Sequence, residues 1–289
     1  MKARMMLGLV LAVLPALLLA PLGRAVQADT APAAPVVMSL TSTLASDEAA
    51  KVSTPLKEQT QAKAAVEERL KASSQAPGAR LGEAPDMNQP SVAEPVARGA
   101  LSLTPETQAA YAYVQPYQEP NNSAHRNYCG PGSAVALLSH WDPDYPHAAD
   151  IDQLGREMKI DPGSGVWIRD IVKPVNDRLN KYLGEDLNWY QYGKATSLED
   201  LRWMIKVDIQ ENAMPFITGL YTGGLPGWGS TDVGHIVAVY GYARHPDGTE
   251  WVSYIDTAPP ASGYHGQIMN TVELGQFWQA VSQNSAQVW

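Results

Sequence analysis

The sequence predicts an α+β fold in one globular domain, with helices first and an antiparallel sheet after them. Aromatic residues are absent from residues 29–105 and recur from Tyr111 to Trp289, which places a core of about 180 residues in the later part of the chain. Residues 130–212 carry helical patterns, whereas residues 216–255 carry runs of β-branched and aromatic residues that are typical of strands. Helices followed by strands, without alternation, indicate the α+β class.

The first 28 residues have the pattern of an export signal. Lys2 and Arg4 precede an apolar run from Met5 to Leu22, and Val26-Gln27-Ala28 has the small residues that signal peptidase recognises. A membrane anchor is the alternative, because the run is nearly long enough to span a bilayer. Since Pro15 interrupts the run, we expect residues 1–28 to be removed. The mature protein is then expected to be secreted or associated with the cell envelope, without stable membrane insertion.

Residues 29–105 form a segment of low complexity. They are rich in Ala, Pro, Ser, Thr, Gln and Glu, which predicts that the segment is largely disordered. One stretch, residues 56–72, has the composition of a charged helix that would be marginally stable alone. Two roles stay open for residues 29–105, a linker and an inhibitory propeptide. The folded domain is predicted to cover residues 106–289.

Helical patterns occupy the first part of this domain. They lie at residues 130–141, 151–158, 167–183 and 197–212. Pro143 and Pro146 end the first helix, and Ser197 opens the last one with a capping box. Pro174 predicts that the third helix is kinked or starts late, because proline removes a backbone donor.

Strand patterns follow the helices. They lie at residues 216–221, 235–242 and 251–255. The turn residues Arg244 to Gly248 separate the last two, which predicts an antiparallel hairpin. A short helix at about residues 273–281 closes the domain.

Charge and cysteine content restrict the class of function. The net charge is −9, and removal of residues 1–28 leaves 18 basic and 30 acidic residues, hence −12. Such an acidic chain is not expected to bind nucleic acid or an anionic membrane surface. A single cysteine cannot form an internal disulfide. A lone thiol in an oxidising compartment is either buried or functional.

Cys129 lies where a nucleophile is expected. It is followed by Gly130-Pro131-Gly132 at the start of the first predicted helix of the domain. Free N–H groups and the helix dipole stabilise a thiolate at a helix N-terminus. Pro131 suits the first turn, and Gly130 lets a substrate approach the backbone. The alternative is a buried structural cysteine beside a Gly-Pro turn.

His235 and Asp256 are the predicted partners of Cys129. His235 begins an apolar strand after a Gly-rich loop, and Asp256 follows the last residue of the next strand. A hairpin would bring both to the same end of the sheet, where the carboxylate would orient the imidazole as a base. Taken alone, each also has a structural explanation, a satisfied core histidine and a turn-forming aspartate.

The combined motifs resemble those of cysteine peptidase family thirty-nine, whose members process bacteriocin leaders and have the papain-like fold. The resemblance rests on Cys129-Gly130-Pro131, on the strand from Gly234-His235 to Gly241-Tyr242, and on Asp256. It covers about residues 112–285. It implies a papain-like cysteine peptidase fold, with N-terminal helices packed on an antiparallel sheet. It also implies hydrolysis of a peptide bond by a thiol, without a metal or an organic cofactor.

The resemblance further implies a glutamine upstream of the cysteine that donates to the oxyanion. Gln118 is the first candidate for this role and Gln115 the second. A polar insertion at Asn121–Arg126 departs from the usual family pattern. Trp228, in the loop before His235, is a candidate substrate contact that could equally pack against its own loop.

These observations favour a secreted, monomeric cysteine peptidase that acts on a peptide or isopeptide bond of a peptide or protein substrate. Two alternatives stay open. One is an amidase or acyltransferase that uses the same triad on cell-wall peptides, and the other is a non-catalytic papain-like binding domain. No metal site is expected, because His125, His140 and His147 lack the spacing of zinc ligands.

Overall fold

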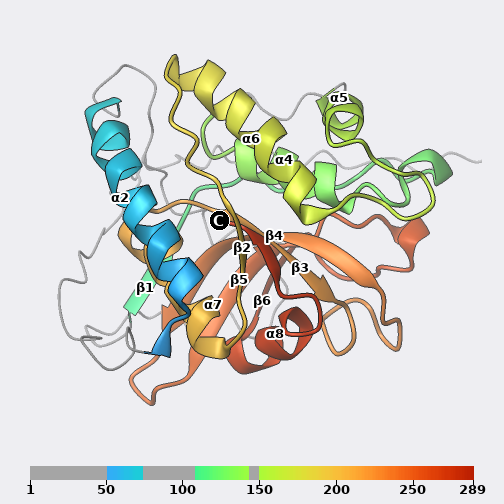
Figure 1. The fold of residues 1–289 in the computed structure, drawn as a ribbon. Coiled ribbons are helices and arrows are strands. Elements are labelled where there is room, and N and C mark those ends of the chain that lie inside the picture. The colour runs from blue at the N-terminus through green and yellow to red at the C-terminus, as the bar shows by residue number, and fades with distance from the viewer. Residues whose placement is uncertain (1–50, 74–107, 143–149) are drawn as a thin grey trace, which may run out of the picture. The chain divides into compact units, whose positions relative to one another are not determined.

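One sheet of seven antiparallel strands lies at the centre of the computed structural model (Figure 1). The structure describes residues 51–73, 108–142 and 150–289, so the predicted export signal lies outside the described residues. The strand order is β2-β7-β3-β4-β5-β6, and β1 pairs with the far part of β4. The strands are β1 (Gln108–Tyr111), β2 (Tyr192–Lys194), β3 (Phe216–Tyr221), β4 (Gly234–Arg244), β5 (Glu250–Ile255), β6 (Met269–Glu273) and β7 (Ala286–Val288).

Helices surround this sheet. The α-helices are α2 (Thr54–Ser73), α4 (Cys129–Leu138), α5 (Asp150–Glu157), α6 (Ile168–Leu183), α7 (Leu198–Ile205) and α8 (Leu274–Val281). The π-helix η2 (Lys206–Glu211) continues α7, and η1 (Ser123–His125) and η3 (Pro260–Ser262) are 3-10 turns. Within the described ranges, no helix has the length and apolar character to cross a membrane.

The predicted α+β order is confirmed. Each predicted helix and strand of the domain is present, and Arg244 pairs with Glu250 in the expected hairpin. Helix α6 begins at Ile168 and continues through Pro174, so the late start considered for this helix does not occur. The sequence did not predict β1, β2, β6 and β7, which are three to five residues long.

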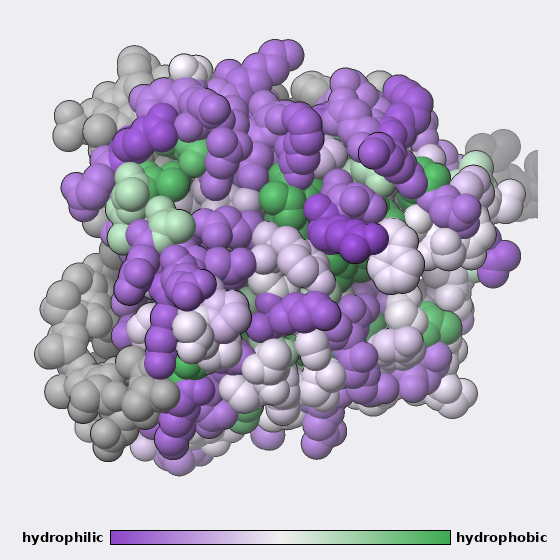
Figure 2. Space-filling model, viewed as in Figure 1, coloured by the Kyte–Doolittle hydropathy of each residue, from purple (hydrophilic) through white to green (hydrophobic). Residues whose placement is uncertain are grey.

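The side chains of β3 and β4 alternate between two apolar clusters. Leu220 and Val237 pack in the cluster that contains buried residues of α7 and α8, whereas Ile217 and Ile236 pack with α4, α5 and α6. Successive side chains of a strand point to opposite faces, so the two clusters lie on the two faces of the sheet. In the view of Figure 2, hydrophilic residues cover most of the surface and apolar atoms are seen only between them.

Helix α2, the charged stretch expected to be marginal alone, packs on the domain (Figure 1). Val52 and Leu56 are buried in the cluster that contains α7. The hydroxyl of Thr60 accepts a hydrogen bond of 2.8 Å from Nε1 of Trp203. The predicted helix is therefore present, and tertiary contacts supply the stability that its own composition does not.

A buried ion pair holds the middle of α2 against the domain. Nζ of Lys63 lies 2.6 Å from Oδ1 of Asp208, and both side chains are almost completely buried. The ammonium group also lies over the rings of Trp189 and Trp289, 4.3 and 4.5 Å from their centroids. Burial lowers the pKa of Lys63 to about 8 and raises that of Asp208 to about 6, and in each case the charge of the partner opposes the shift. The attraction between two opposite charges is strong in such a dry environment.

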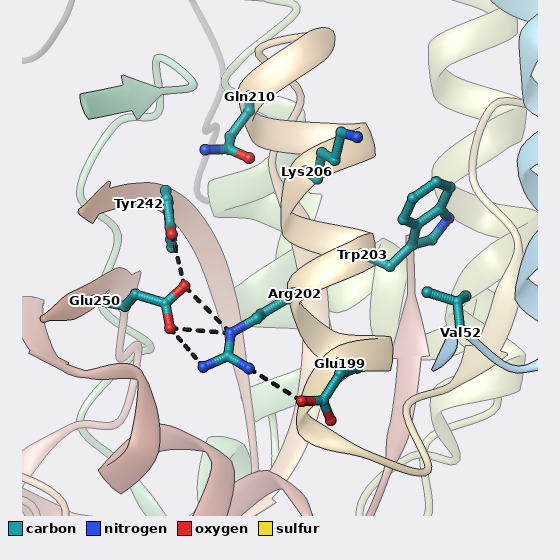
Figure 3. A pocket seen from close by; sticks show the side chains of 8 residues that line it. All are labelled: Val52, Glu199, Arg202, Trp203, Lys206, Gln210, Tyr242 and Glu250. Carbon is teal, nitrogen blue, oxygen red and sulfur yellow. Dashed lines mark hydrogen bonds and ion pairs between the residues drawn. The ribbon is translucent and has the colours of Figure 1, made fainter. Parts of the chain in front are cut away.

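A second ion network joins α7 to the β4–β5 hairpin and lines a pocket (Figure 3). The guanidinium of Arg202 donates to both carboxylate oxygens of Glu250 and also to Glu199. The hydroxyl of Tyr242 donates to Glu250 at 2.7 Å. Arg202 is thus paired with two carboxylates and joins α7 to the first residue of β5.

We expect Lys63→Met and Asp208→Asn each to lower the free energy of unfolding by about 3 kcal/mol or more, because either change leaves a polar or charged group buried without its partner. The double variant should lose less than the sum of the two. Urea unfolding followed by tryptophan fluorescence measures all three changes.

Lys173→Met is the matched control, because Lys173 pairs with Asp177 on the surface, where 82% of its side chain is exposed. Its effect should stay within about 0.5 kcal/mol. Equal effects at Lys63 and Lys173 would show that the buried pair does not hold α2.

Candidate active site

Cys129 is the first residue of α4, and its side chain is partly exposed. The N-cap residue, Tyr128, makes no side-chain hydrogen bond to the start of the helix. The first turn therefore keeps N–H groups that no capping side chain occupies, and these favour negative charge on the Cys129 sulfur.

Gly130 is buried beside the cysteine. A Cβ atom at this position would lie 2.1 Å from Cγ1 of Val166, so only glycine lets Val166 pack against the start of α4. This packing is one reason for the glycine, and the approach of a substrate to Gly130 stays a prediction.

His235 lies between Cys129 and Asp256, the residue that follows the last residue of the neighbouring strand β5. It is the second residue of β4, opposite Leu220 of β3, and is 5% exposed. Nε2 of its ring donates to Oδ1 of Asp256 at 2.8 Å, and the Cys129 side chain lies close enough to the imidazole to raise its pKa. The structure thus brings together the three residues that the sequence singled out.

The environment of His235 favours the charged imidazolium. Burial lowers the pKa of His235, but the charge and hydrogen bond of Asp256, followed by those of Cys129, outweigh burial. The net result is a pKa well above 6.5. An imidazolium next to a sulfur atom stabilises the thiolate form of that sulfur.

The carboxylate of Asp256 is completely buried and accepts three hydrogen bonds. Besides His235, these come from Nε1 of Trp228 to Oδ2 at 2.8 Å and from the backbone N–H of Ala258 to Oδ1 at 3.1 Å. Three donors compensate for the cost of burying this charge and fix the orientation of the carboxylate.

Trp228 covers the His235–Asp256 pair from the inside. Its ring meets the His235 ring edge-on, with 5.0 Å between centroids, and only 3% of the residue is exposed. The adjacent Gly227 has a positive φ, and a Cβ there would lie 2.4 Å from Cα of Gly266, which explains how the loop packs so closely. Trp228 is therefore enclosed and hydrogen-bonded to Asp256, and it lacks the exposed surface that the predicted contact with a substrate requires.

The two candidate glutamines lie near opposite ends of α4. The side-chain amide of Gln118 donates to the carbonyl of Ala258, two residues after Asp256, at 3.4 Å. The backbone N–H of Gln115 donates to Ser139, which is the C-cap of α4. A helix of ten residues is about 15 Å long. The geometry thus favours Gln118 over Gln115 as a residue near Cys129.

Glu119 also belongs to this site, although the sequence reasoning did not single it out. It is 3% exposed, and its Oε1 accepts a hydrogen bond of 2.6 Å from the hydroxyl of Thr257. Burial raises the pKa of Glu119 to about 7, against the opposing effects of the Thr257 hydrogen bond and the charge of His235. The available signal was its position next to Gln118, in the segment expected to approach Cys129, and this position did not predict that Glu119 is buried.

The described residues contain no group of three His, Cys, Asp or Glu side chains arranged to hold a metal ion. Nδ1 of His140 lies 2.9 Å from the carbonyl oxygen of Tyr113, and burial lowers the pKa of His140 to about 4. The His125 ring bonds to Asn122 and Asp152. The third histidine considered, His147, lies outside the described residues.

A sulfur at a helix N-terminus, a charged imidazole and an orienting carboxylate form an arrangement that suits nucleophilic attack on a carbonyl group. A family model described as the Peptidase_C39 like family matches residues 108–286. No curated protein matches the sequence.

The solved structures that are similar to this chain include two cysteine proteases. The Amb a 11 cysteine protease of ragweed pollen, in its proform, has a TM-score of 0.41 and 12% identity, over 65% of this chain and 67% of its own. The bromelain protease of Ananas comosus, in complex with the E64 inhibitor, has a TM-score of 0.40 and 7% identity, over 64% of this chain and 98% of its own.

The family match spans more than half of the chain, including Cys129, His235 and Asp256, and it confirms the resemblance drawn from their motifs. The chain belongs to the Peptidase_C39 like family, and it is a cysteine peptidase by this membership.

Proposed function

We propose that the protein is a secreted peptidase that hydrolyses a peptide or isopeptide bond with Cys129 as nucleophile, His235 as acid and base, and Asp256 as orienting residue. The observation that carries the proposal is the 2.8 Å hydrogen bond between His235 and Asp256, together with the Cys129 side chain beside the same imidazole, whose pKa is raised. This is the charge distribution that a thiolate–imidazolium pair requires.

The reaction uses these groups in two stages. The thiolate of Cys129 attacks the carbonyl carbon, and the electron pair moves to the carbonyl oxygen. The C–N bond then breaks while the imidazolium of His235 gives its proton to the leaving amine, which leaves a thioester. Neutral His235 next takes a proton from water, whose oxygen attacks the thioester carbon. The acid product departs, and the thiolate and imidazolium are restored.

The oxyanion needs donors near the start of α4. The backbone N–H of Cys129 supplies one in this proposal, and the amide of Gln118 supplies the second. The bond from Gln118 to the Ala258 carbonyl is long, at 3.4 Å, so the amide loses little by turning from it toward a substrate.

The proposal of secretion rests on residues 1–28, with their basic start, apolar run and small residues. A peptide or protein is the proposed substrate, and peptides of the cell wall are candidates because an exported enzyme would meet them. The acidic charge of the chain does not favour nucleic acid as a partner.

Cys129→Ala should lower kcat/KM for any accepted peptide by about 10³-fold or more, because the nucleophile is removed. Lys173→Ala, a change on the exposed face of α6, should leave kcat/KM unchanged. The assay uses a casein-derived peptide mixture and peptidoglycan fragments in parallel, and mass spectrometry identifies the bond that is cut. Equal activity of wild type and Cys129→Ala on both substrates would refute the proposal and favour a binding domain.

The pH dependence of kcat/KM should report on His235. Its raised pKa means that the imidazolium persists well above pH 6.5 and that activity falls as the pH rises through this pKa. Asp256→Asn removes the charge that raises the pKa, so the alkaline limb should move to lower pH and kcat/KM should fall by about 10²-fold. Identical alkaline limbs in the two proteins, measured from pH 5 to 10 at constant ionic strength, would contradict this assignment.

A further inference from the structure

Glu119 places a second buried carboxyl group close to the proposed His235–Asp256 pair. We propose that Glu119 is a positioning residue that fixes the Asp256 segment against α4 through Thr257 and helps to keep His235 protonated. This inference rests on the proposed function and deepens it, because it assigns control of the imidazole charge to a side chain outside the triad.

Hydrogen bonds join the segment of Glu119 to the segment of Thr257, which is distant in the sequence. The backbone N–H of Glu119 donates to the carbonyl of Thr257 at 2.8 Å, and the hydroxyl of Thr257 donates to the Glu119 carboxylate at 2.6 Å. Asn121 extends the contact, because its Oδ1 accepts from the backbone N–H of Ala261 at 2.9 Å. The chain before Cys129 is thereby bound to the chain directly after Asp256.

The side chains of Glu119 and Thr257 also pack against α4, the helix that carries the proposed nucleophile. A Cβ at Gly132 of α4 would lie 2.8 Å from Oγ1 of Thr257 and 3.0 Å from Cγ of Glu119. Gly132 lies about one helical turn after Cys129. Glu119 therefore lies where the segments that carry Cys129 and Asp256 meet. Its removal would let the distance between these two segments vary more.

Glu119 also interacts electrostatically with the His235–Asp256 pair. Glu119 interacts with the charges of His235 on β4 and of Asp256 after β5. His235 in turn interacts with Asp256 and with Cys129 on α4. Glu119 interacts with His235 favourably and with Asp256 unfavourably. Because a charge interaction is mutual, an ionised Glu119 must raise the pKa of His235. Its effect is smaller than that of Asp256, which bonds directly to the ring.

The test is the pH dependence of Cys129 alkylation by iodoacetamide in the full chain. Cys129 is the single cysteine, so each alkylation event reports on this site, and no substrate has to be known. The rate should show a step where His235 loses its proton. Glu119→Gln keeps the size of the side chain and an acceptor for Thr257 but cannot ionise. It should move this step to lower pH by about 0.5 unit while the melting temperature stays nearly unchanged.

Two further variants separate charge from packing. Glu119→Ala also removes the acceptor for Thr257, so it should lower the melting temperature as well as move the step. Glu199→Gln, in the pocket of Figure 3, removes a carboxylate paired with Arg202 and should leave the step in place.

A step at the same pH in wild type and Glu119→Gln would overturn this inference and leave the Cys129–His235 pair intact. A wild-type Cys129 that reacts like an ordinary thiol, with a single ionisation near pH 8.5, would overturn the proposed function and the role of Glu119 together.

Discussion

The buried carboxylate of Asp256 is the charge around which the site is built. A lone carboxylate without water is unstable, so its three donors, from His235, Trp228 and the Ala258 backbone, are a requirement of the fold as much as of the chemistry. Two of these donors come from the Gly-rich loop and the strand that follows it. The same charge favours the positive form of the imidazole, which lies beside the Cys129 sulfur at the N-terminus of α4.

The residues of this site lie on α4 and β4, and each of these two elements is held in place for a different reason. Helix α4 is buried along nearly its whole length, so it is apolar on every side and fixed by packing. Strand β4 is bonded on both edges, by β3 and β1 on one and by β5 on the other. Cys129 and His235, the proposed nucleophile and base, lie on such elements and therefore keep their mutual position.

Much of this arrangement could be predicted from the sequence. Local patterns were sufficient for α4 to α8, for the β4–β5 hairpin, and for the meeting of Cys129, His235 and Asp256 at one end of the sheet. The short strands β2 and β7 were missed because three residues carry no periodicity, and only their pairing with each other and with β3 defines them.

The burial of Trp228 and Glu119 could not be predicted for a similar reason. A tryptophan in a Gly-rich loop and a glutamate before a proline are ordinary surface patterns. Their roles depend on the approach of Gly266 and Thr257, residues distant in sequence, and no local pattern encodes that approach.

The docking of α2 has a consequence for the maturation of the protein. The helix is joined to the domain by a dry ion pair, by two indole rings and by apolar contacts, none of which requires the backbone that follows α2 to be intact. A cut between residue 73 and residue 108 would therefore leave each of these contacts in place.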